Sequence, residues 1–231
     1  MKNAAHGKLN ARLRSASEFV RQDAYFADVG TDHAYLPLFL LESGRIKTAV
    51  CADINKGPLK TAKKNIDEAG LSDRVKLVLT DGAEGLSEFG ITDYAICGMG
   101  GELIADIIKR SPHLAKKGIR LILGPMSKQA HLRRYLAERG FSVICEAYSY
   151  DAGKYYLTLA CEYTGEVRNI TDFEAEFGNL PPRAEFSPEM HGYVYKKIKS
   201  LEKIIKGKAN GKDGAVREMA LLSEFIMRVG E

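Results

Sequence analysis

A short apolar segment runs directly into a glycine and three polar residues in the stretch Ala27-Asp28-Val29-Gly30-Thr31-Asp32-His33. The strand pattern covers Tyr25–Val29, and a helical pattern begins soon afterwards at Leu36–Glu42. In a sheet wound with helices, a glycine at the carboxyl end of a strand lets the backbone approach a bound ligand closely. This stretch therefore predicts the first strand–turn–helix unit of such a sheet.

Strand and helix patterns continue to alternate along the chain. Further strands are predicted at Thr48–Ala52, Val75–Leu79, Tyr94–Cys97 and Ile119–Leu123, and further helices at Pro58–Ala69, Glu102–Arg110 and Gln129–Glu138. This alternation indicates an α/β fold with a mostly parallel sheet. Two final strand patterns, Ser142–Tyr150 and Tyr155–Tyr163, are separated by only four residues, so we expect an antiparallel hairpin.

The pattern changes after this hairpin. Thr164–Ser187 is acidic and rich in turn-forming residues, which is typical of a linker. From Pro188 onward, apolar residues recur at alternating steps of three and four, which predicts two antiparallel helices joined through Lys206–Gly214 as a small coiled-coil hairpin. Because two helices bury little surface, we expect the hairpin to lean on the main domain or on its neighbour. The predicted domains are 1–163 and 188–231, with 164–187 as the linker.

The composition is that of a soluble globular protein, with 231 residues of which 45% are hydrophobic and 28% charged. The longest apolar run, Tyr35–Leu41, is too short to span a bilayer, and Met1–Arg14 lacks the apolar core of a signal peptide, so we expect a cytoplasmic protein. The cysteines are widely spaced within apolar runs, which predicts buried reduced thiols and no disulfide or metal knuckle; they are Cys51, Cys97, Cys145 and Cys161.

The net charge of +4 is modest, but the basic residues are concentrated in two stretches. Lys109–Arg139 holds nine Lys or Arg against one acid, and Met190–Lys212 holds seven lysines against one acid. Such faces can bind phosphates, whereas the alternative is that lysine-rich helices are simply solvated. The charge distribution does not resemble that of a DNA-coating protein, and we expect no DNA partner.

Polar residues and glycines stand at the ends of the first four predicted strands. Asp53 follows Gly30 by 23 residues, a position from which a carboxylate can accept hydrogen bonds from both hydroxyls of a ribose. Asp81-Gly82 ends the third strand, where a carboxylate can accept from an adenine amino group, and Gly98-Met99-Gly100-Gly101 ends the fourth. The further glycines of GxGxxG are missing, which counts against a pyrophosphate ligand.

These motifs resemble those of the bacterial tRNA adenine-22 N1-methyltransferases, the TrmK family. The resemblance rests on Ala27-Asp28-Val29-Gly30-Thr31-Asp32-His33-Ala34-Tyr35-Leu36-Pro37, Ala52-Asp53-Ile54-Asn55-Lys56-Gly57-Pro58, Asp81-Gly82, Gly98-Met99-Gly100-Gly101 and Leu121-Ile122-Leu123-Gly124-Pro125-Met126. It also includes Arg12-Leu13, the linker residues Glu176-Phe177-Gly178 and the C-terminal hairpin. Gly124 departs from the family, which more often carries an amide such as Gln before Pro-Met.

The resemblance implies a Rossmann-like class I methyltransferase domain followed by a coiled-coil domain, with S-adenosylmethionine as methyl donor, S-adenosylhomocysteine as product and N1 of a tRNA adenine, at position 22, as acceptor. The expected cofactor-binding residues are Asp28, Gly30, Thr31, Asp53, Ile54, Asn55, Asp81, Gly82, Gly98 and Met99. The expected substrate-binding residues are Gly100, Gly101, Pro125, Met126, Lys196, Lys197 and Lys203.

Adenine N1 carries an in-plane lone pair, so methyl transfer to it needs positioning more than acid or base chemistry. We expect the catalytic residues to be Asp32, which can accept from the adenine N6 amino group, and His33 and Tyr35, which can hold the ring. Helix capping is the alternative role for Asp32 and His33. No His, Cys or carboxylate spacing indicates a metal.

Two other functions fit the same motifs. One is a class I methyltransferase that acts on a small molecule or a protein, and the other is a non-catalytic nucleotide-binding regulatory module that dimerises through its helical hairpin. We expect a monomer or a weak homodimer.

Overall fold

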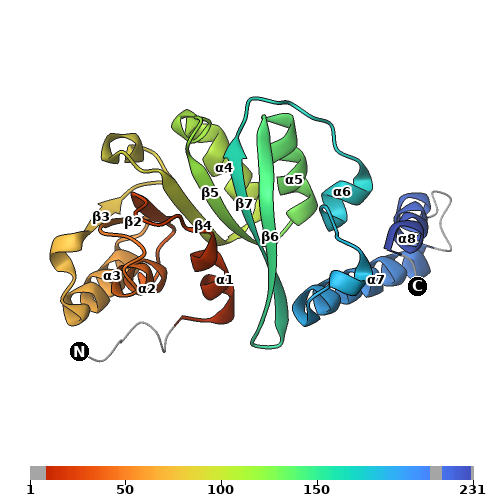
Figure 1. Cartoon of the computed structure of the whole chain (residues 1–231), viewed down its shortest axis with the longest axis horizontal. Helices are drawn as coiled ribbons and strands as arrows, with labels where there is room; N and C mark the ends of the chain where they lie inside the picture. The colour runs from red at the N-terminus through yellow and green to blue at the C-terminus, as the bar shows by residue number, and fades with distance from the viewer. Residues whose placement is uncertain (1–8, 209–214, 230–231) are drawn as a thin grey trace.

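The computed structural model describes residues 9–208 and 215–229, and it contains a seven-stranded sheet in the order β3-β2-β1-β4-β5-β7-β6 (Figure 1). The strands are β1 Phe26–Val29, β2 Ala49–Asp53, β3 Val75–Leu79, β4 Asp93–Gly100, β5 Arg120–Ser127, β6 Phe141–Asp151 and β7 Lys154–Tyr163. The first five strands are parallel, and β7 is antiparallel to both β5 and β6. The predicted fold class, a mostly parallel sheet with an antiparallel final hairpin, is confirmed.

The helices are α1 Ala11–Phe19, α2 Tyr35–Glu42, α3 Lys56–Ala69, α4 Gly101–Arg110, α5 Gln129–Glu138, α6 Asp172–Phe177, α7 Pro188–Lys208 and α8 Val216–Val229. The predicted helices are present within a few residues of their expected bounds, and two helices, α1 and α6, were not predicted. Gly70 ends α3 in the left-handed conformation, with φ +69°, which explains why the helix stops there. The strands β4 and β5 run further than predicted, because Met99 still pairs with Pro125 and Gly100 with Ser127.

Both faces of the sheet are buried, which is why its central strands are nearly continuous apolar runs. Phe26 points into a cluster with Leu36 and Leu40 of α2, whereas its neighbour Ala27 joins the cluster on the other face with Ile104 of α4. The helices α1, α2 and α3 cover one face, and α4 and α5 cover the other. The ends of the parallel strands are consequently the part of the sheet that remains accessible to ligands.

The N-terminal helix α1 packs across β5, β6 and β7 on one face of the sheet (Figure 1). Asn10 caps it by accepting a hydrogen bond from the backbone N–H of Leu13 at 2.9 Å. Just beyond its C-terminus, Arg21 forms an ion pair of 2.6 Å with the fully buried Asp93 at the start of β4. This pair fixes α1 relative to the sheet.

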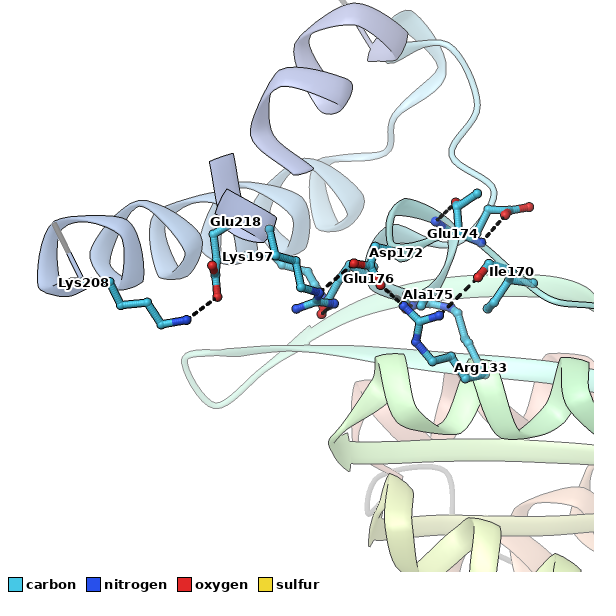
Figure 2. A network of polar contacts seen from close by, with 12 residues as sticks. Arg133, Ile170, Asp172, Glu174, Ala175, Glu176, Lys197, Lys208 and Glu218 are labelled. Carbon is cyan, nitrogen blue, oxygen red and sulfur yellow. Dashed lines mark hydrogen bonds and ion pairs between the residues drawn. The ribbon is translucent and has the colours of Figure 1, made fainter. Parts of the chain in front are cut away.

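The segment expected to be a linker contains the packed helix α6. Thr171 and Glu174 form a capping box at its start, a local motif that is visible in the sequence. Its acidic residues bind cations of the neighbouring helices (Figure 2): Asp172 pairs with Arg134 of α5 and with Arg217 of α8, and Glu176 pairs with Lys197 of α7 at 2.9 Å. Much of the alternation between basic and acidic stretches in the sequence therefore serves internal contacts.

The C-terminal helices α7 and α8 contact each other and rest on the main domain, as expected. Lys208 at the end of α7 lies 3.0 Å from Glu218 at the start of α8, so the chain reverses between the two helices. Tyr193 and Leu201 of α7 and Leu221 of α8 join the same core cluster as α4 and α5. The connection predicted at Lys206–Gly214 extends into residues 209–214, which lie outside the described part of the chain.

The prediction of four buried thiols is wrong for Cys145, and Cys97 is only partly buried. All four cysteines are free, and Cys51 and Cys161 are buried, but Cys145 is exposed. A register shift between Val143 and Cys145 in the outermost strand turns this residue outward. None of the helices in the two described ranges combines the length and the apolar composition that a membrane crossing requires.

Candidate functional site

The ends of β1 to β5 lie side by side along one edge of the sheet. The backbone N–H groups of Gly30 and Thr31 donate to the carbonyl of Ala52 at 2.8 and 3.0 Å, and that of Thr80 donates to the carbonyl of Asp53 at 3.0 Å. These bonds join the turns after β1 and β3 to the end of β2. The predicted residues of the first four strand ends are thus brought together at this edge.

Gly30 and Met99 are in direct contact at its centre. Gly30 has φ +80°, and a Cβ built on it would lie 2.1 Å from Cε of Met99. Gly98 has φ +86°. Both glycines therefore adopt a backbone conformation that a side chain would strain, which leaves main chain open to a ligand between β1 and β4. Met99 packs on the core, so its contact with Gly30 is fixed.

Arg12 of α1 reaches the same edge, although sequence reasoning did not place it in the site. Its Nη1 would lie 3.5 Å from a Cβ on Gly98, and among residues 9–208 and 215–229 this buried nitrogen has no hydrogen-bond partner. A buried guanidinium N–H that lacks an acceptor indicates that an anionic group belongs beside it. The only signal in the sequence was the Arg12-Leu13 pair shared with the TrmK family.

Asp28 is buried at the end of β1. Burial raises the pKa of its carboxyl from 3.8 to about 6, while the nearby Thr31 hydroxyl and the Arg12 guanidinium oppose this rise. Asp53, which is also acidic, adds to it from the end of β2. The centre of the edge thus combines the Arg12 guanidinium, whose Nη1 lacks a hydrogen-bond acceptor in the described residues, with a buried carboxyl whose pKa is raised.

Asp53 and its neighbours form the next part of the edge. Asp53 is the last residue of β2, and its Oδ1 accepts a hydrogen bond of 2.7 Å from the backbone N–H of Asn55. This bond orients the carboxylate at the end of β2. Ile54 is 59% exposed and presents an apolar surface beside it. A carboxylate next to an apolar side chain can bind a nucleoside, because the carboxylate accepts from the sugar hydroxyls and the apolar side chain packs on the base.

Asp81 lies beyond the end of β3, where Arg110 of α4 binds it. The guanidinium donates to both carboxylate oxygens, at 2.9 and 3.0 Å. The ion pair with Arg110 orients the Asp81 carboxylate. Each carboxylate oxygen retains a further lone pair, so a ligand can bind Asp81 while Arg110 stays in place. Gly82 has φ +63°, and a Cβ there would press on Ile107 at 3.0 Å, which gives this glycine a packing role.

Asp32, His33 and Tyr35 form an exposed group at the start of α2. The Asp32 carboxylate is 71% exposed and lies 3.1 Å from Nε2 of His33, whose ring stacks on Tyr35 with centroids 5.0 Å apart. The capping alternative is wrong: the N-cap residue of α2 is Ala34, and no side chain caps it. Asp32 is thus exposed at the lip of the edge, His33 is partly exposed beside it, and Tyr35 packs partly on the core and supports the His33 ring.

The fourth and fifth strands close this edge on the other side. Gly100 lies against Ser127, and Met126 is exposed beside them. Gly101 is buried, and a Cβ there would lie 2.5 Å from the carbonyl oxygen of Lys128, so close approach of two backbones explains this glycine.

Cys97 explains the departure from the family at position 124. A Cβ on Gly124 would lie 3.0 Å from Sγ of Cys97 and 3.3 Å from its Cα, so the space for a longer side chain is taken. Pro125 follows directly and pairs with Met99 across the strands. At this end of β5, contacts to a substrate can come only from the residues after Gly124.

The three lysines expected to bind phosphates are not equivalent. Lys203 is exposed on α7, and Lys196 is exposed with its Nζ bonded to the carbonyl of Gly153 at 3.0 Å. Lys197 is only 16% exposed and pairs with Glu176, and its burial lowers the pKa of the ammonium. Lys197 thus takes part in the contact between α6 and α7, and its role in substrate binding stays a prediction.

Across residues 9–208 and 215–229, no three His, Cys, Asp or Glu side chains gather closely enough to hold a metal ion.

Comparison with known proteins bears on this edge and on the whole chain. A family model described as a methyltransferase domain matches residues 9–159. The tRNA (adenine(22)-N(1))-methyltransferase of Bacillus subtilis (strain 168) is 32% identical over 155 residues, which cover 67% of this chain and 65% of that protein. The match thus spans just under two thirds of that relative's length.

A crystal structure of a candidate tRNA (m1A22) methyltransferase from Streptococcus pneumoniae superimposes with a TM-score of 0.82 at 32% identity, covering 96% of this chain and 100% of that one. A second structure of the same protein, in complex with S-adenosyl-L-methionine, gives a TM-score of 0.80 and covers 92% and 97% of the two chains. The fold, the arrangement of strand ends and these similarities agree, and the chain belongs to the TrmK family of methyltransferases.

Proposed function

We propose that this protein transfers a methyl group from S-adenosylmethionine to N1 of an adenine in tRNA, at position 22. The observation that carries the proposal is the buried, unpartnered Nη1 of Arg12 at the glycine-lined edge where β1 and β4 end. A methionine carboxylate is the kind of anion that this nitrogen lacks. The relatives named above support the choice of cofactor and acceptor.

The residues along the edge fit the parts of this cofactor in order. Arg12 suits the carboxylate, the exposed glycine Gly98 suits the thin methionine portion, and Gly30 and Thr31 shape the turn beneath it. Asp53 suits the ribose hydroxyls, Ile54 and Asn55 flank the next position, and Asp81 with Gly82 suits the adenine amino group. When bound, S-adenosylmethionine supplies a methyl group on a positively charged sulfur. Met99, which is uncharged, neither pairs with such a centre nor repels it.

The acceptor side is formed by Asp32, His33 and Tyr35 together with Gly100, Pro125 and Met126. Asp32 accepts a hydrogen bond from the N6 amino group of adenine, and it repels the O6 oxygen of guanine. The stacked rings of His33 and Tyr35 hold the base, and the exposed side chain of Met126 adds apolar contact. No residue needs to remove a proton from N1, because neutral adenine carries a lone pair there.

The remaining assignments belong to the same proposal. Residues 1–163 form the catalytic domain and residues 188–231 a helical domain that contributes Lys196 and Lys203 to tRNA binding. The protein acts as a monomer or a weak homodimer in the cytoplasm, without DNA as a partner and without a metal.

Methylation of unmodified tRNA transcripts, followed by mapping of the methylated nucleotide, tests the proposal. We expect one methyl group per transcript at N1 of adenine 22, and no product when that position is guanine. Methylation at another atom, or of a small molecule but not of tRNA, would refute the acceptor. Cofactor binding without methylation of any tRNA would favour the regulatory alternative.

Asp32→Asn separates the roles that this residue can have. We expect cofactor affinity and thermal stability near those of the wild type, and a single-turnover methylation rate lower by about 100-fold, because acceptor orientation is lost. Weakened cofactor affinity would instead place Asp32 on the methionine amino group. An unchanged rate would remove it from the site.

A further inference from the structure

The hairpin of β6 and β7 continues beyond the sheet at the edge that holds the candidate site. β7 pairs with β5 only from Arg120↔Glu162 to Leu123↔Leu159, whereas β6 and β7 remain paired as far as Asp151↔Lys154. Because β7 is antiparallel to β5, the tip at 151–154 lies on the side toward which β5 runs to Pro125 and Met126. Figure 1 shows this ribbon extending between α1 and α7.

The tip is fixed to α7 by an interlocking contact. Gly192 of α7 leaves room for the ring of Tyr155, because a Cβ at position 192 would lie 2.0 Å from Cζ of that ring. One turn further along α7, Lys196 donates to the carbonyl of Gly153 at 3.0 Å, and its Nζ lies 5.1 Å from the centre of the Tyr155 ring. The ribbon is therefore held in place at its outermost residues.

Tyr150 stands on this fixed base. It is the direct cross-strand partner of Tyr155, and the two ring centres are 4.7 Å apart. Tyr155 is half-buried, but Tyr150 is 52% exposed. An aromatic ring that is supported from one side and open on the other is a ready stacking surface, because little conformational entropy remains to be lost on binding.

The charges around Tyr150 suit a phosphate backbone. Lys154 pairs with Asp151 at the next register position, at the tip of the ribbon, and Lys196 lies beyond Tyr155; both lysines are exposed. On the outer side of α7, Tyr195 is 61% exposed, with Nζ of Lys199 5.5 Å from its ring centre. Asp151 at the turn is the one acid among residues 147–161. Aromatic and basic side chains thus alternate over this surface.

We propose that Tyr150, with Lys154 and Lys196, forms a stacking platform for an unpaired nucleotide of the tRNA that flanks the target adenine. The inference rests on the proposed function, and it assigns part of RNA binding to the strand hairpin of the catalytic domain. A target base must leave its stack to reach such a site, and the nucleotide next to it then loses a stacking partner. An aromatic ring beside the site can replace that partner.

The absence of tryptophan from the sequence allows a direct test. Tyr150→Trp places a single fluorescent indole on the platform, and Tyr25→Trp is the matched control. Tyr25 is 60% exposed but precedes β1, so it lies at the opposite edge of the sheet. Titration with tRNA transcript should quench the indole at position 150 and leave that at position 25 unchanged.

Affinity and activity complete the test. Tyr150→Ala should weaken tRNA binding about 5- to 100-fold with unchanged S-adenosylhomocysteine affinity and unchanged melting temperature, and Tyr150→Phe should restore binding. Lys154→Ala should reduce the salt dependence of binding by about one phosphate contact.

Three results would overturn the inference. One is an unquenched indole at position 150 while tRNA is bound, and another is wild-type affinity and methylation by Tyr150→Ala. The third is a changed oligomeric state of Tyr150→Ala with unchanged tRNA affinity, which would make the surface a protein contact. In each case wild-type methylation of tRNA would leave the proposed function standing, whereas failure of the wild type to bind or methylate any tRNA would refute both.

Discussion

The ring of Tyr155 fills the space directly over Gly192, so that a Cβ on the glycine would lie 2.0 Å from Cζ of the tyrosine. This contact joins the strand hairpin to α7 and sets where the helical domain begins. Lys197 of α7 also pairs with Glu176 of α6, so α7 contacts both the strand hairpin and α6. These contacts determine where α7 lies relative to the candidate site.

Gly192→Ala should lower the free energy of unfolding by about 1–3 kcal/mol, because the added methyl group forces the Tyr155 ring or α7 to move. Gly207→Ala in the same helix is the control. Among the described residues nothing lies within 4 Å of a Cβ at position 207, so this variant should gain about 0.5–1 kcal/mol from the better helix former. Urea unfolding of both variants measures the difference. Equal effects would show that Tyr155 does not depend on the glycine.

Arg12→Gln should weaken S-adenosylhomocysteine binding about 10- to 100-fold, because a charge-assisted hydrogen bond to the carboxylate is lost. Its melting temperature should change little without cofactor, since Nη1 of the guanidinium donates no hydrogen bond within the described residues. Arg14→Gln, an exposed position two residues further along the same helix, serves as control. Calorimetry with both variants decides the assignment. Full affinity in Arg12→Gln would require another anchor for the carboxylate.

Asp28→Asn should change the pH dependence of stability. The native carboxyl holds its proton up to a pKa of about 6, against 3.8 in the unfolded chain, so the native state binds more protons between these values. The contribution of Asp28 to stability therefore falls as pH rises through this window.

Without cofactor, the stability of Asp28→Asn relative to the wild type should grow from pH 4 to 6.5 and then level off at about 1–3 kcal/mol. Asp106→Asn, exposed on α4, should show no such growth. Chemical unfolding at a series of pH values provides the comparison. A constant difference from pH 4 to 7 would contradict the altered pKa of Asp28.

Arg133→Met should destabilise the protein by about 3–5 kcal/mol, because it removes one partner of a buried ion pair. The Arg133 side chain is 3% exposed and binds Glu146 with two hydrogen bonds of 2.8 Å. It also donates to the carbonyls of Ala175 and Glu176 in the segment of α6 (Figure 2).

Adding Glu146→Gln should recover part of this loss, since an amide costs less to bury unpaired than a carboxylate. Arg139→Met, at an exposed position just after the same helix, is expected to have little effect. Thermal and urea unfolding report all of these changes. A loss below 1 kcal/mol for Arg133→Met would show that the pair is not a strong contact.

Lys197→Ala and Lys203→Ala should separate the structural lysine from the RNA-binding one. Lys197→Ala should lower stability with little change in the salt dependence of tRNA binding, because it leaves Glu176 without this partner. Lys203→Ala should keep stability and reduce the slope of log affinity against log salt by about 0.7–0.9. Filter binding at several salt concentrations, with melting temperatures, distinguishes them. The reverse pattern would restore Lys197 as a phosphate contact.

The sequence by itself determined the strands, most of the helices and the composition of the strand ends. The apolar run of β3 was located without error, and Asp53 and Gly30 were identified as residues at strand ends, because strand periodicity and the glycine after a strand are local properties of the chain. The family motifs also identified the chain as a methyltransferase of the TrmK family. The order of the strands in the sheet could be expected from the fold class, but no single segment of the sequence indicates it.

Only the tertiary structure decided which charged residues are free. Lys197 and Lys203 are alike in the sequence, yet one is covered by Glu176 and the other is exposed. Arg12 reaches the site from a helix that precedes β1, and Tyr150 gains its support from a residue across the strand. The burial of a side chain and its ion-pair partner depend on residues that are distant in the sequence, so only the tertiary structure shows them. Secondary-structure propensity and hydrophobic periodicity depend on a few neighbouring residues, so the sequence by itself shows the helices and strands.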